Sequence, residues 1–452
     1  MLKGMSVAAT TLGCKVNQAE TDSMLDMLKA AGANIVEFDE KADIYIVNTC
    51  SVTNIADKKS RQMLHRARKM NPDGIVIAAG CYVQSAREIL EQDEAIDIVI
   101  SNNKKKSITE IVNDYINVRN NEKNAPGKDH EAMEYFVDIS RETEYEEMGG
   151  HVPVGHTRAY VKIQDGCNQF CSYCIIPYVR GRIRSRSQEA ILAEVSELAE
   201  AGIKEVVLTG IHISSYGKDK NNEGALIELI EAISKIKGIK RIRLGSLEPG
   251  IITEEFVERI SSNSKVCPHF HLSLQSGCDS VLKRMNRKYT CEQYFEKCDM
   301  LRKAYKSLAL TTDVIVGFPG ETEEEFAETV RYLTELNLYE MHIFKYSPRK
   351  GTVAAAMKEQ VAPEIKNERS DVLLKLAHDN KTAYEAQFEG CELEVLVEEV
   401  VKKNNKTYLR GHTERYMDIL IDVGDISMPE SFVNSFVYVT YTQNGGNLPL
   451  LL

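Results

Sequence analysis

The sequence is poor in the features that would direct it to a membrane or make it a general nucleic-acid binder. No run approaches the roughly 18 apolar residues that a membrane-spanning helix needs, and the N-terminus, MLKGMSVAATTLGCKV, has only a short apolar stretch. Positive charge is scarce, because 56 Lys and Arg face 67 Asp and Glu and the formal net charge is -11. We therefore expect a cytoplasmic protein without membrane contact, in which any RNA contact is local, since phosphate binding depends on Lys and Arg.

Cysteine is the most informative residue type that is present. The chain has 11 cysteines among 452 residues, and a cytosolic protein keeps its thiols reduced. A disulfide framework is therefore a poor explanation for these cysteines, and metal ligation is a better one.

The length predicts about three domains, and the order of the expected elements suggests where they lie. Residues 1–145 alternate short strand-like runs with helical patterns, which is typical of a parallel α/β domain, and much of 103–150 reads as a linker with room for a helix or hairpin. Residues 153–384 contain six strand candidates separated by crossover-length segments, which predicts a partial, TIM-like β/α barrel of about six strands. Residues 385–452 predict a small all-β barrel.

The segment GCNQFCSYC places Cys167, Cys171 and Cys174 in a C-x3-C-x2-C spacing just after the first strand candidate of the second domain. Chance would produce this spacing only about 0.006 times in a chain of this composition. A structural zinc ion takes four protein ligands, so a zinc site would need His156 or a distant residue to complete it. A four-iron cluster held by three thiolates instead keeps one iron open, and an open iron is a reaction site.

A second set of three cysteines shares a structural context and not a local spacing. Cys14 follows SVAATTLG, Cys50 follows IYIVNT and Cys81 follows IVIAAG, so each comes at the end of a predicted parallel strand. The carboxyl ends of such strands line one edge of the sheet, where ligands bind. A buried core cysteine is the alternative for any one of them, but all three together favour a metal site. The remaining five show no ligand spacing and are expected to pack in the core or at the surface: Cys267, Cys278, Cys291, Cys298 and Cys391.

Several motifs together resemble the radical S-adenosylmethionine (SAM) methylthiotransferases: TLGCKVNQAET, NTCSVTNIADKKSRQ, AAGCYVQ, GCNQFCSYCIIPYVRGRIRSR, HLSLQSG, NRKYT and DVIVGFPGETEEEF. The resemblance runs from about Ser6 to the C-terminus. It implies an N-terminal cluster-binding domain, a partial radical SAM barrel and a C-terminal RNA-associated β-barrel called TRAM. It also implies two 4Fe-4S clusters, an auxiliary one on Cys14, Cys50 and Cys81 and a SAM-cleaving one on Cys167, Cys171 and Cys174.

The family chemistry that this resemblance implies is sulfur and methyl insertion at an unactivated C–H bond. Such a bond offers no acidic proton to a general base, so a radical made from SAM must remove the hydrogen. A reducing electron donor must supply an electron to the cluster that cleaves SAM. The resemblance further implies SAM contacts by Tyr173, Thr209, Gly210, Gln275 and Asp313. Taken alone, Gly210 also fits a simple turn, and Gln275 and Asp313 also fit structural hydrogen bonds.

Two basic elements are expected to flank this site. The segment RGRIRSR carries alternating arginines that would share one face of an extended chain and bind phosphate, with a solvated charge run as the alternative. The helical pattern DKKSRQMLHRARKM carries a second basic side. The expected RNA contacts are Arg180, Arg182, Arg184, Arg186, Lys58 and Arg61. The segment from Glu385 onward is acidic, which instead fits a basic protein partner.

The family has branches that act on different substrates, and NTCSVTNIADKKSRQ and YVRGRIRSR look most like the threonylcarbamoyladenosine branch. The resemblance therefore implies conversion of N6-threonylcarbamoyladenosine next to the tRNA anticodon to its 2-methylthio derivative. The alternatives are the same chemistry on isopentenyladenosine in tRNA or on an aspartate of a ribosomal protein. A non-catalytic zinc or RNA-binding scaffold is a more remote alternative.

Overall fold

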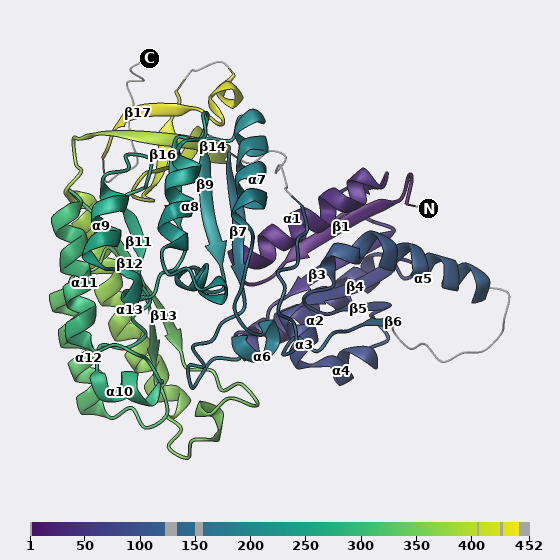
Figure 1. Ribbon diagram of the computed structural model, residues 1–452, viewed down its shortest axis with the longest axis horizontal. Helices are drawn as coiled ribbons and strands as arrows, with labels where there is room; N and C mark the ends of the chain where they lie inside the picture. Colours follow the sequence, from purple (N-terminus) through teal and green to yellow (C-terminus); the bar gives the residue numbers. More distant parts are fainter. Residues whose placement is uncertain (1, 123–132, 150–156, 405, 425–427, 443–452) are drawn as a thin grey trace.

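The computed structural model describes residues 2–122, 133–149, 157–404, 406–424 and 428–442. Along the chain these residues form an N-terminal α/β unit, a central β/α barrel and a C-terminal antiparallel sheet (Figure 1). The predicted fold class is confirmed: the first two parts are α/β, and the third is all-β. Within the described residues, no helix is long and apolar enough to cross a bilayer.

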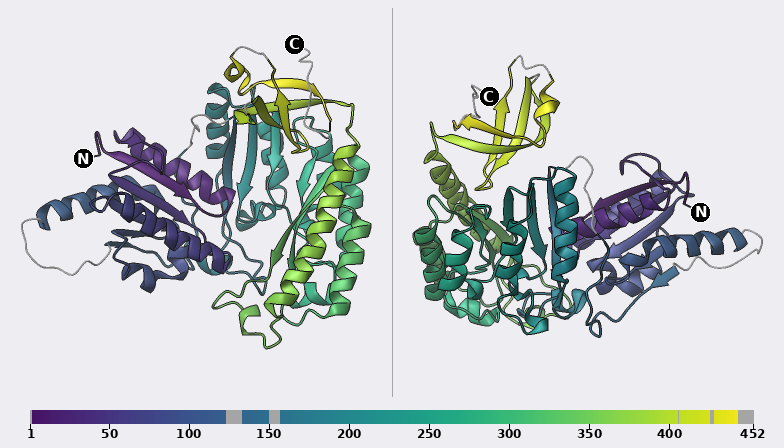
Figure 2. Two further views of the ribbon diagram at one scale, coloured as in Figure 1. Left: turned by 180° about the vertical axis from the view of Figure 1, so that it is seen from behind. Right: turned by 45° about the horizontal axis from the view of Figure 1, so that its top comes forward.

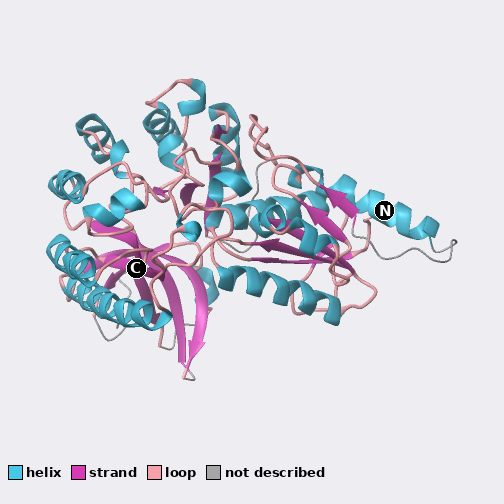
Figure 3. Cartoon of the chain, turned by 90° about the horizontal axis from the view of Figure 1, so that it is seen from below, coloured by secondary structure: helices cyan, strands magenta, loops and turns pink. Residues whose placement is uncertain are grey.

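The N-terminal unit is a parallel sheet of six strands in the order β2-β1-β3-β4-β5-β6. Its central strands, IYIVNT and IVIAAG, are buried at every residue, because helices cover both faces of the sheet (Figure 3). The strands are β1 (Ser6–Thr11), β2 (Asn34–Ile35), β3 (Ile44–Thr49), β4 (Ile75–Gly80), β5 (Ile98–Ile100) and β6 (Met133–Tyr135). The helices are α1 (Lys15–Ala30), α2 (Asn54–Met70), α3 (Cys81–Ser85), α4 (Arg87–Glu91) and α5 (Ile108–Glu122). Both α5 and β6 lie within the stretch that reads mostly as a linker.

The central unit is a curved wall of six parallel strands, with β8 added antiparallel at one edge. Strands β10-β9-β7-β8 form one sheet and β11-β12-β13 another, and parallel bridges from Ile242 to Val266 and from Leu247 to Leu272 join them. The strands are β7 (Arg158–Asp165), β8 (Arg184–Ser185), β9 (Glu205–Gly210), β10 (Arg241–Leu244), β11 (His269–His271), β12 (Ala309–Val316) and β13 (Glu340–Lys345). The predicted partial barrel of about six strands is therefore confirmed.

Helices surround the barrel strands and close its apolar core. The helices are α6 (Ile176–Arg180), α7 (Gln188–Glu200), α8 (Ala225–Ser234), α9 (Glu254–Ser261), α10 (Asp279–Arg284), α11 (Cys291–Ala304), α12 (Glu323–Leu336) and α13 (Pro363–Ala386). Capping boxes begin α11 at Thr290 and α12 at Thr322, because each threonine accepts from a backbone N–H that the helix leaves unpaired. Short 3-10 turns occur at η1 (Lys105–Ser107), η2 (Ile213–Ser215), η3 (Lys218–Lys220), η4 (Pro249–Ile251), η5 (Ala354–Ala356) and η6 (Pro429–Phe432).

The C-terminal sheet packs on one end of the barrel, and the long helix α13 connects the barrel to this sheet (Figure 2). Its antiparallel order is β16-β15-β14-β17, as predicted for a small all-β unit. The strands are β14 (Glu392–Lys403), β15 (Lys406–Thr413), β16 (Asp418–Asp422) and β17 (Phe436–Thr440). Buried Arg241 and Arg243 of β10 donate to backbone carbonyls of His412 and Glu414, so barrel and sheet share polar contacts.

Candidate active site

Cys14, Cys50 and Cys81 lie at the ends of three neighbouring strands, because β1, β3 and β4 are adjacent in the sheet. Gly13 shows how closely the loops approach. Its φ is +103°, and a Cβ there would lie 2.7 Å from Cys50 Sγ, so the position requires glycine. Burial, together with the neighbouring Cys81 and Cys14 thiols, raises the pKa of the Cys50 thiol to about 12. The thiols therefore interact, and a bound cation would favour their thiolate forms.

Cys81 also accepts polar contacts, one from the barrel and one from the N-terminal unit. The Nε of Arg180 lies 3.2 Å from Cys81 Sγ, and the Nδ2 of Asn102 lies 3.9 Å from the same sulfur. Hydrogen bonds to ligand sulfurs are a recurrent feature of iron-sulfur sites, where they tune the reduction potential. The surroundings of these cysteines thus fit an iron-sulfur cluster.

Cys167, Cys171 and Cys174 lie in the loop between β7 and α6. Burial and the neighbouring thiols raise the pKa of Cys167 to about 11 and that of Cys174 to about 12. The backbone N–H of Gln169 lies 3.4 Å from Cys167 Sγ, and a guanidinium nitrogen of Arg287 lies 3.3 Å from Cys171 Sγ. This second group has the same character as the first, with close thiols and N–H donors aimed at sulfur.

Neither cysteine group is spaced for a single zinc ion. Within the described residues, His271, Asp313 and His342 are the only set of three potential ligands whose donor atoms all lie within 4.8 Å of one another. Sulfurs around one zinc would be closer than that, because Zn–S bonds are about 2.3 Å long. A cluster of several irons spaces its ligands more widely. The proposed completing ligand of a zinc site, His156, lies outside the described residues.

Both cysteine groups open onto one cavity of about 530 Å³. Its lining includes Cys14 and Cys50 from the N-terminal unit and Cys174 from the barrel loop. The short helix α6 lies between the barrel and the N-terminal sheet (Figure 1), where it contacts α3. The fold thus brings thiols more than 100 positions apart in the sequence to the wall of one chamber.

Three of the five residues expected to contact SAM also line this cavity: Tyr173, Gln275 and Asp313. Burial raises the pKa of Tyr173, which keeps its phenol neutral. Gln275 has a φ of +76°, uncommon for a side chain other than glycine, and its backbone N–H donates to the carbonyl oxygen of Asp313. The geometry therefore places these three side chains where a ligand would lie.

Thr209 and Gly210 are not part of that lining. Thr209 is buried at the end of β9, and a Cβ at Gly210 would lie 3.0 Å from both the backbone and the side-chain oxygen of Gln164. The small size of Gly210 therefore serves packing against β7, whatever further role its backbone has.

Arg287 and Glu248, two residues that sequence reasoning missed, lie beside the second cysteine group. Buried Arg287 bridges Cys171 and Glu248, with 2.5 Å between its guanidinium and the Glu248 carboxylate. Beyond Glu248 lies a second cavity of about 430 Å³, which His212 and Tyr289 also line. Burial and the charge of Arg287 lower the pKa of His212 to about 4, so this imidazole is neutral at physiological pH. Arg287 belongs to the quoted motif NRKYT, and that motif was the available signal.

The prediction that the arginines of RGRIRSR share one face of an extended chain and bind phosphate is wrong for Arg180. This side chain is fully buried, and it donates to Glu20 at 2.6 Å and to Asp165 at 3.1 Å. Its role is to pair carboxylates between the N-terminal unit and the barrel, because a buried charge requires a partner.

The same prediction is wrong for Arg184 and Arg186, which are also buried. Arg184 donates to the carbonyl oxygens of Arg180 and Arg182, and Arg186 pairs with Glu194 and Glu147. The segment turns through the end of α6 and β8, so alternate side chains do not share an exposed face. Arg182 alone of the four is exposed, over the ring of Phe170 at 4.5 Å.

On α2, the two residues expected to contact RNA differ in their solvent exposure and in their hydrogen bonds. Lys58 is exposed, whereas Arg61 is half-buried and donates to the hydroxyl of Tyr82. Lys58 therefore remains accessible to an anionic partner, and Arg61 is already held by a neighbouring phenol.

Comparisons with known proteins agree with this geometry. Residues 161–333 match the radical SAM superfamily, and residues 6–101 match an uncharacterised protein family, UPF0004. The fold is similar to the radical SAM methyltransferase TsrM from Kitasatospora setae with cobalamin and a [4Fe-4S] cluster bound, with a TM-score of 0.56 and 16% identity over 76% of each chain. The fold and the loop of three cysteines thus define a radical SAM enzyme.

Curated relatives show to which family of radical SAM enzymes the chain belongs. The chain is 40% identical to threonylcarbamoyladenosine tRNA methylthiotransferase MtaB of Bacillus subtilis (strain 168), over 92% of this chain and 90% of the relative. It is 38% identical to the protein of that name from Aquifex aeolicus, over 92% and 98%. It is 35% identical to tRNA-2-methylthio-N(6)-dimethylallyladenosine synthase of Thermoanaerobacter pseudethanolicus (strain ATCC 33223 / 39E), over 96% and 90%. The chain belongs to the radical SAM methylthiotransferase family, whose cofactors are SAM and two [4Fe-4S] clusters.

Proposed function

We propose that this enzyme converts N6-threonylcarbamoyladenosine next to the tRNA anticodon to its 2-methylthio derivative. The observation that carries the proposal is the 530 Å³ cavity onto which both cysteine groups open, because methylthiolation requires radical formation and sulfur delivery at one carbon. The substrate branch is supported by relatives named for threonylcarbamoyladenosine, which are 35% to 40% identical and include the two at 40% and 38%. Relatives named for dimethylallyladenosine are 35% to 37% identical.

The proposal assigns the six cysteines to two clusters. Cys14, Cys50 and Cys81 hold the auxiliary cluster, and Cys167, Cys171 and Cys174 hold the cluster that binds SAM. When bound, these groups supply reductive cleavage of SAM and transfer of sulfur. A reducing electron donor completes the system, and the reaction takes place in the cytoplasm.

The protein's own side chains position the reactants and exclude water. Tyr173, Gln275 and Asp313 border the cavity and are proposed to contact SAM, together with the backbone at Thr209 and Gly210. The neutral Tyr173 phenol can donate a hydrogen bond without adding charge beside the thiolates. Holding the reactants side by side in one cavity shortens the path of a reactive radical to its target carbon.

The proposed domain limits are 1–145 for the cluster-binding domain, 153–384 for the barrel and 385–452 for the TRAM barrel. The proposed tRNA contacts are Lys58, Arg61 and Arg182, of which Lys58 and Arg182 are exposed. Charges accessible to solvent can neutralise phosphate, whereas buried arginines already paired with carboxylates cannot.

Mass spectrometry of tRNA nucleosides from cells lacking the gene tests the proposal. We expect loss of the 2-methylthio derivative of threonylcarbamoyladenosine, with the isopentenyladenosine derivative intact. Wild-type protein restores the product, and the Cys171→Ala variant does not. Loss of the isopentenyl derivative instead would assign the enzyme to the other tRNA branch.

A further inference from the structure

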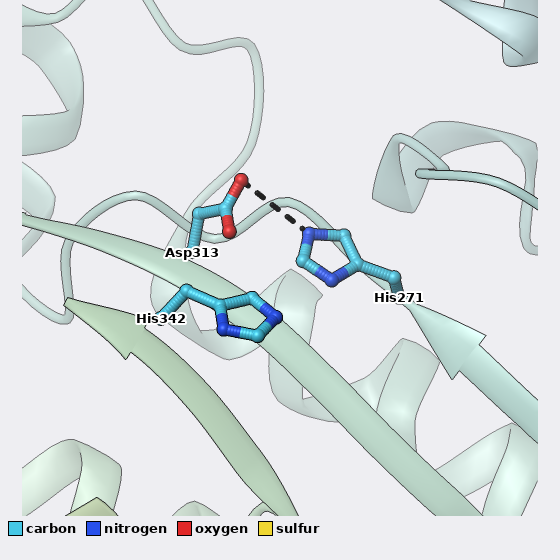
Figure 4. Close-up of side chains that lie close together, drawn as sticks. All are labelled: His271, Asp313 and His342. Atoms are coloured by element: carbon cyan, nitrogen blue, oxygen red, sulfur yellow. Dashed lines mark ion pairs between the residues drawn. The ribbon is translucent and has the colours of Figure 1, made fainter. Parts of the chain in front are cut away.

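We propose that His271, Asp313 and His342 form a binding site for one divalent transition-metal ion, separate from both cysteine groups. The three residues come from the neighbouring parallel strands β11, β12 and β13 (Figure 4). Asp313 is paired in register with His342, and His271 with Thr311. Because Thr311 and Asp313 are two positions apart on one strand, the side chains of the three residues project from the same face of the sheet.

The donor atoms are close enough to share one ion. One ligand atom from each residue lies within 4.8 Å of the others, and His271 Nε2 is 3.5 Å from an oxygen of Asp313. The two imidazole rings are stacked, with centroids 5.9 Å apart and planes inclined by 17°. Two ligands of one ion lie at most about 4.2 Å apart, twice the metal–ligand bond length. The donor atoms lie close to that limit, and His342 is the exposed member of the three.

His271 is already oriented as a ligand. Its Nδ1 forms a hydrogen bond with the hydroxyl of Thr311 at 3.0 Å, which fixes the ring. Its Nε2 is buried and makes no hydrogen bond within the described residues, although Asp313 lies beside it. Metal-binding histidines characteristically use one ring nitrogen for an orienting hydrogen bond and the other for the ion. An ion would supply a bond to this buried nitrogen, which has an ion pair with Asp313 but no hydrogen bond.

The donor set indicates the class of ion. Two imidazoles and one carboxylate suit zinc or ferrous iron, whereas magnesium and calcium prefer oxygen ligands throughout. Three protein ligands leave at least one coordination position open. Asp313 also lines the cavity shared by the cysteine groups, so an ion here would border the same chamber. The inference goes beyond the proposed function, because it requires neither cluster and adds a metal-binding role for Asp313 to its proposed contact with SAM.

Zinc binding to the full-length chain, with both cysteine groups first loaded with iron under anaerobic conditions, tests the inference. Equilibrium dialysis against Zn²⁺ followed by elemental analysis should find one more zinc per chain in the wild-type protein than in the His342→Ala variant. The Thr311→Val variant should bind this zinc roughly 10- to 100-fold more weakly, since loss of an orienting partner has that effect.

Two controls keep the result interpretable. His378→Ala, at an exposed position of α13, should bind zinc as the wild type does. Iron content measured on every variant separates loss of this site from loss of a cluster, and so from failure of the proposed function. Equal zinc in the wild-type and His342→Ala proteins, or no tightly bound zinc in either, would overturn the inference.

Discussion

The two cysteine groups reach similar surroundings by different routes. Cys167, Cys171 and Cys174 share one short loop, so local chain geometry brings them together. The N-terminal three are gathered from the ends of β1, β3 and β4, so only the folded sheet brings them together. A site assembled by tertiary structure depends on every element that holds it, whereas a loop site depends mainly on its own backbone.

Each group has a buried arginine beside one sulfur, and the comparison extends to these two side chains. Arg287 contacts Cys171 and pairs with Glu248, and both lie in the barrel. Arg180 contacts Cys81 of the N-terminal unit although it belongs to α6 of the barrel. The N-terminal cysteine site therefore includes a residue of the neighbouring unit, and its integrity depends on how the two units pack.

A network of charges surrounds Arg180 at this junction. Glu20 of α1 also accepts from Lys162 of β7 at 2.7 Å and from Lys105. Burial alone would raise the pKa of Glu20, but Arg180 and the two lysines outweigh it and hold the pKa well below its ordinary value. Asp165 is held ionised in the same way by Lys162 and Arg180. Loss of one cation would leave these buried carboxylates only partly compensated.

The largest expected effect comes from removing one cysteine of each group. Cys171→Ala should abolish SAM cleavage, because the SAM-binding cluster is lost. Cys50→Ala should leave SAM cleavage measurable and stop formation of the methylthio product. Liquid chromatography of deoxyadenosine and mass spectrometry of the nucleoside separate the two activities.

The matched control is Cys391→Ala, at an exposed cysteine of the C-terminal part, which should leave both activities as in the wild type. Methylthio product from the Cys50→Ala enzyme would refute the auxiliary-cluster role of the N-terminal group.

Next in size is the effect of replacing the arginine that joins the two units. Arg180→Gln removes a buried guanidinium that pairs with Glu20 and Asp165 and leaves these carboxylates with their lysine partners alone. Because one positive charge of the buried network is then missing, the free energy of unfolding should fall by roughly 3–5 kcal/mol. We also expect the protein to retain less iron than the wild type, because the N-terminal group loses its contact with Arg180. Denaturant unfolding and elemental analysis measure the two effects.

Arg182→Gln, at the exposed arginine of the same segment, is the control and should change stability by less than about 0.5 kcal/mol. A normal stability and a full iron content for Arg180→Gln would mean that the junction does not support the N-terminal cysteines.

The sequence predicts well what depends on local pattern. The strand runs IYIVNT and IVIAAG, the six barrel strands and the position of each cysteine after a strand follow from hydrophobic periodicity and spacing. Because parallel strand ends meet at one edge, the convergence of Cys14, Cys50 and Cys81 could also be anticipated.

The sequence does not reveal which charges are buried. RGRIRSR reads as an exposed basic run, yet Arg180 finds its partner 160 positions away, at Glu20. Sequence reasoning assigns Arg180 to phosphate because the pairing exists only after two units dock. The same reason hides His271 and His342, whose 71-residue separation gives no motif although their strands flank β12 in the sheet. Long-range pairing of polar side chains needs the tertiary structure.

A smaller effect is expected from replacing Arg287, the arginine beside the loop cysteines. Arg287→Lys keeps a positive charge, but an ammonium cannot reproduce the planar fork that reaches both Cys171 and Glu248. With a weaker hydrogen bond to sulfur, the reduction potential of the loop cluster should become more negative. Redox titration followed by electron paramagnetic resonance measures this potential.

The potential of the N-terminal cluster should stay unchanged in this variant, and so should both potentials in Lys283→Ala, at an exposed position of α10. A shift of both clusters by the same amount would show that Arg287 acts through the general field of the protein and not through its contact with Cys171.

The smallest expected effect concerns the one arginine of RGRIRSR that is free for an anionic partner. Arg182→Ala removes a solvent-exposed charge, so it should weaken tRNA binding and make the dependence of log K on log salt shallower by about 0.7 to 0.9, the contribution of one phosphate contact. Binding assays over a range of salt concentrations measure the slope, and thermal unfolding should be unchanged. Arg184→Ala is the buried counterpart: it should lower the melting temperature and leave the slope as in the wild type. The opposite pattern, with the slope altered only by Arg184→Ala, would mean that the segment rearranges when RNA binds, so that an interior arginine becomes the phosphate contact.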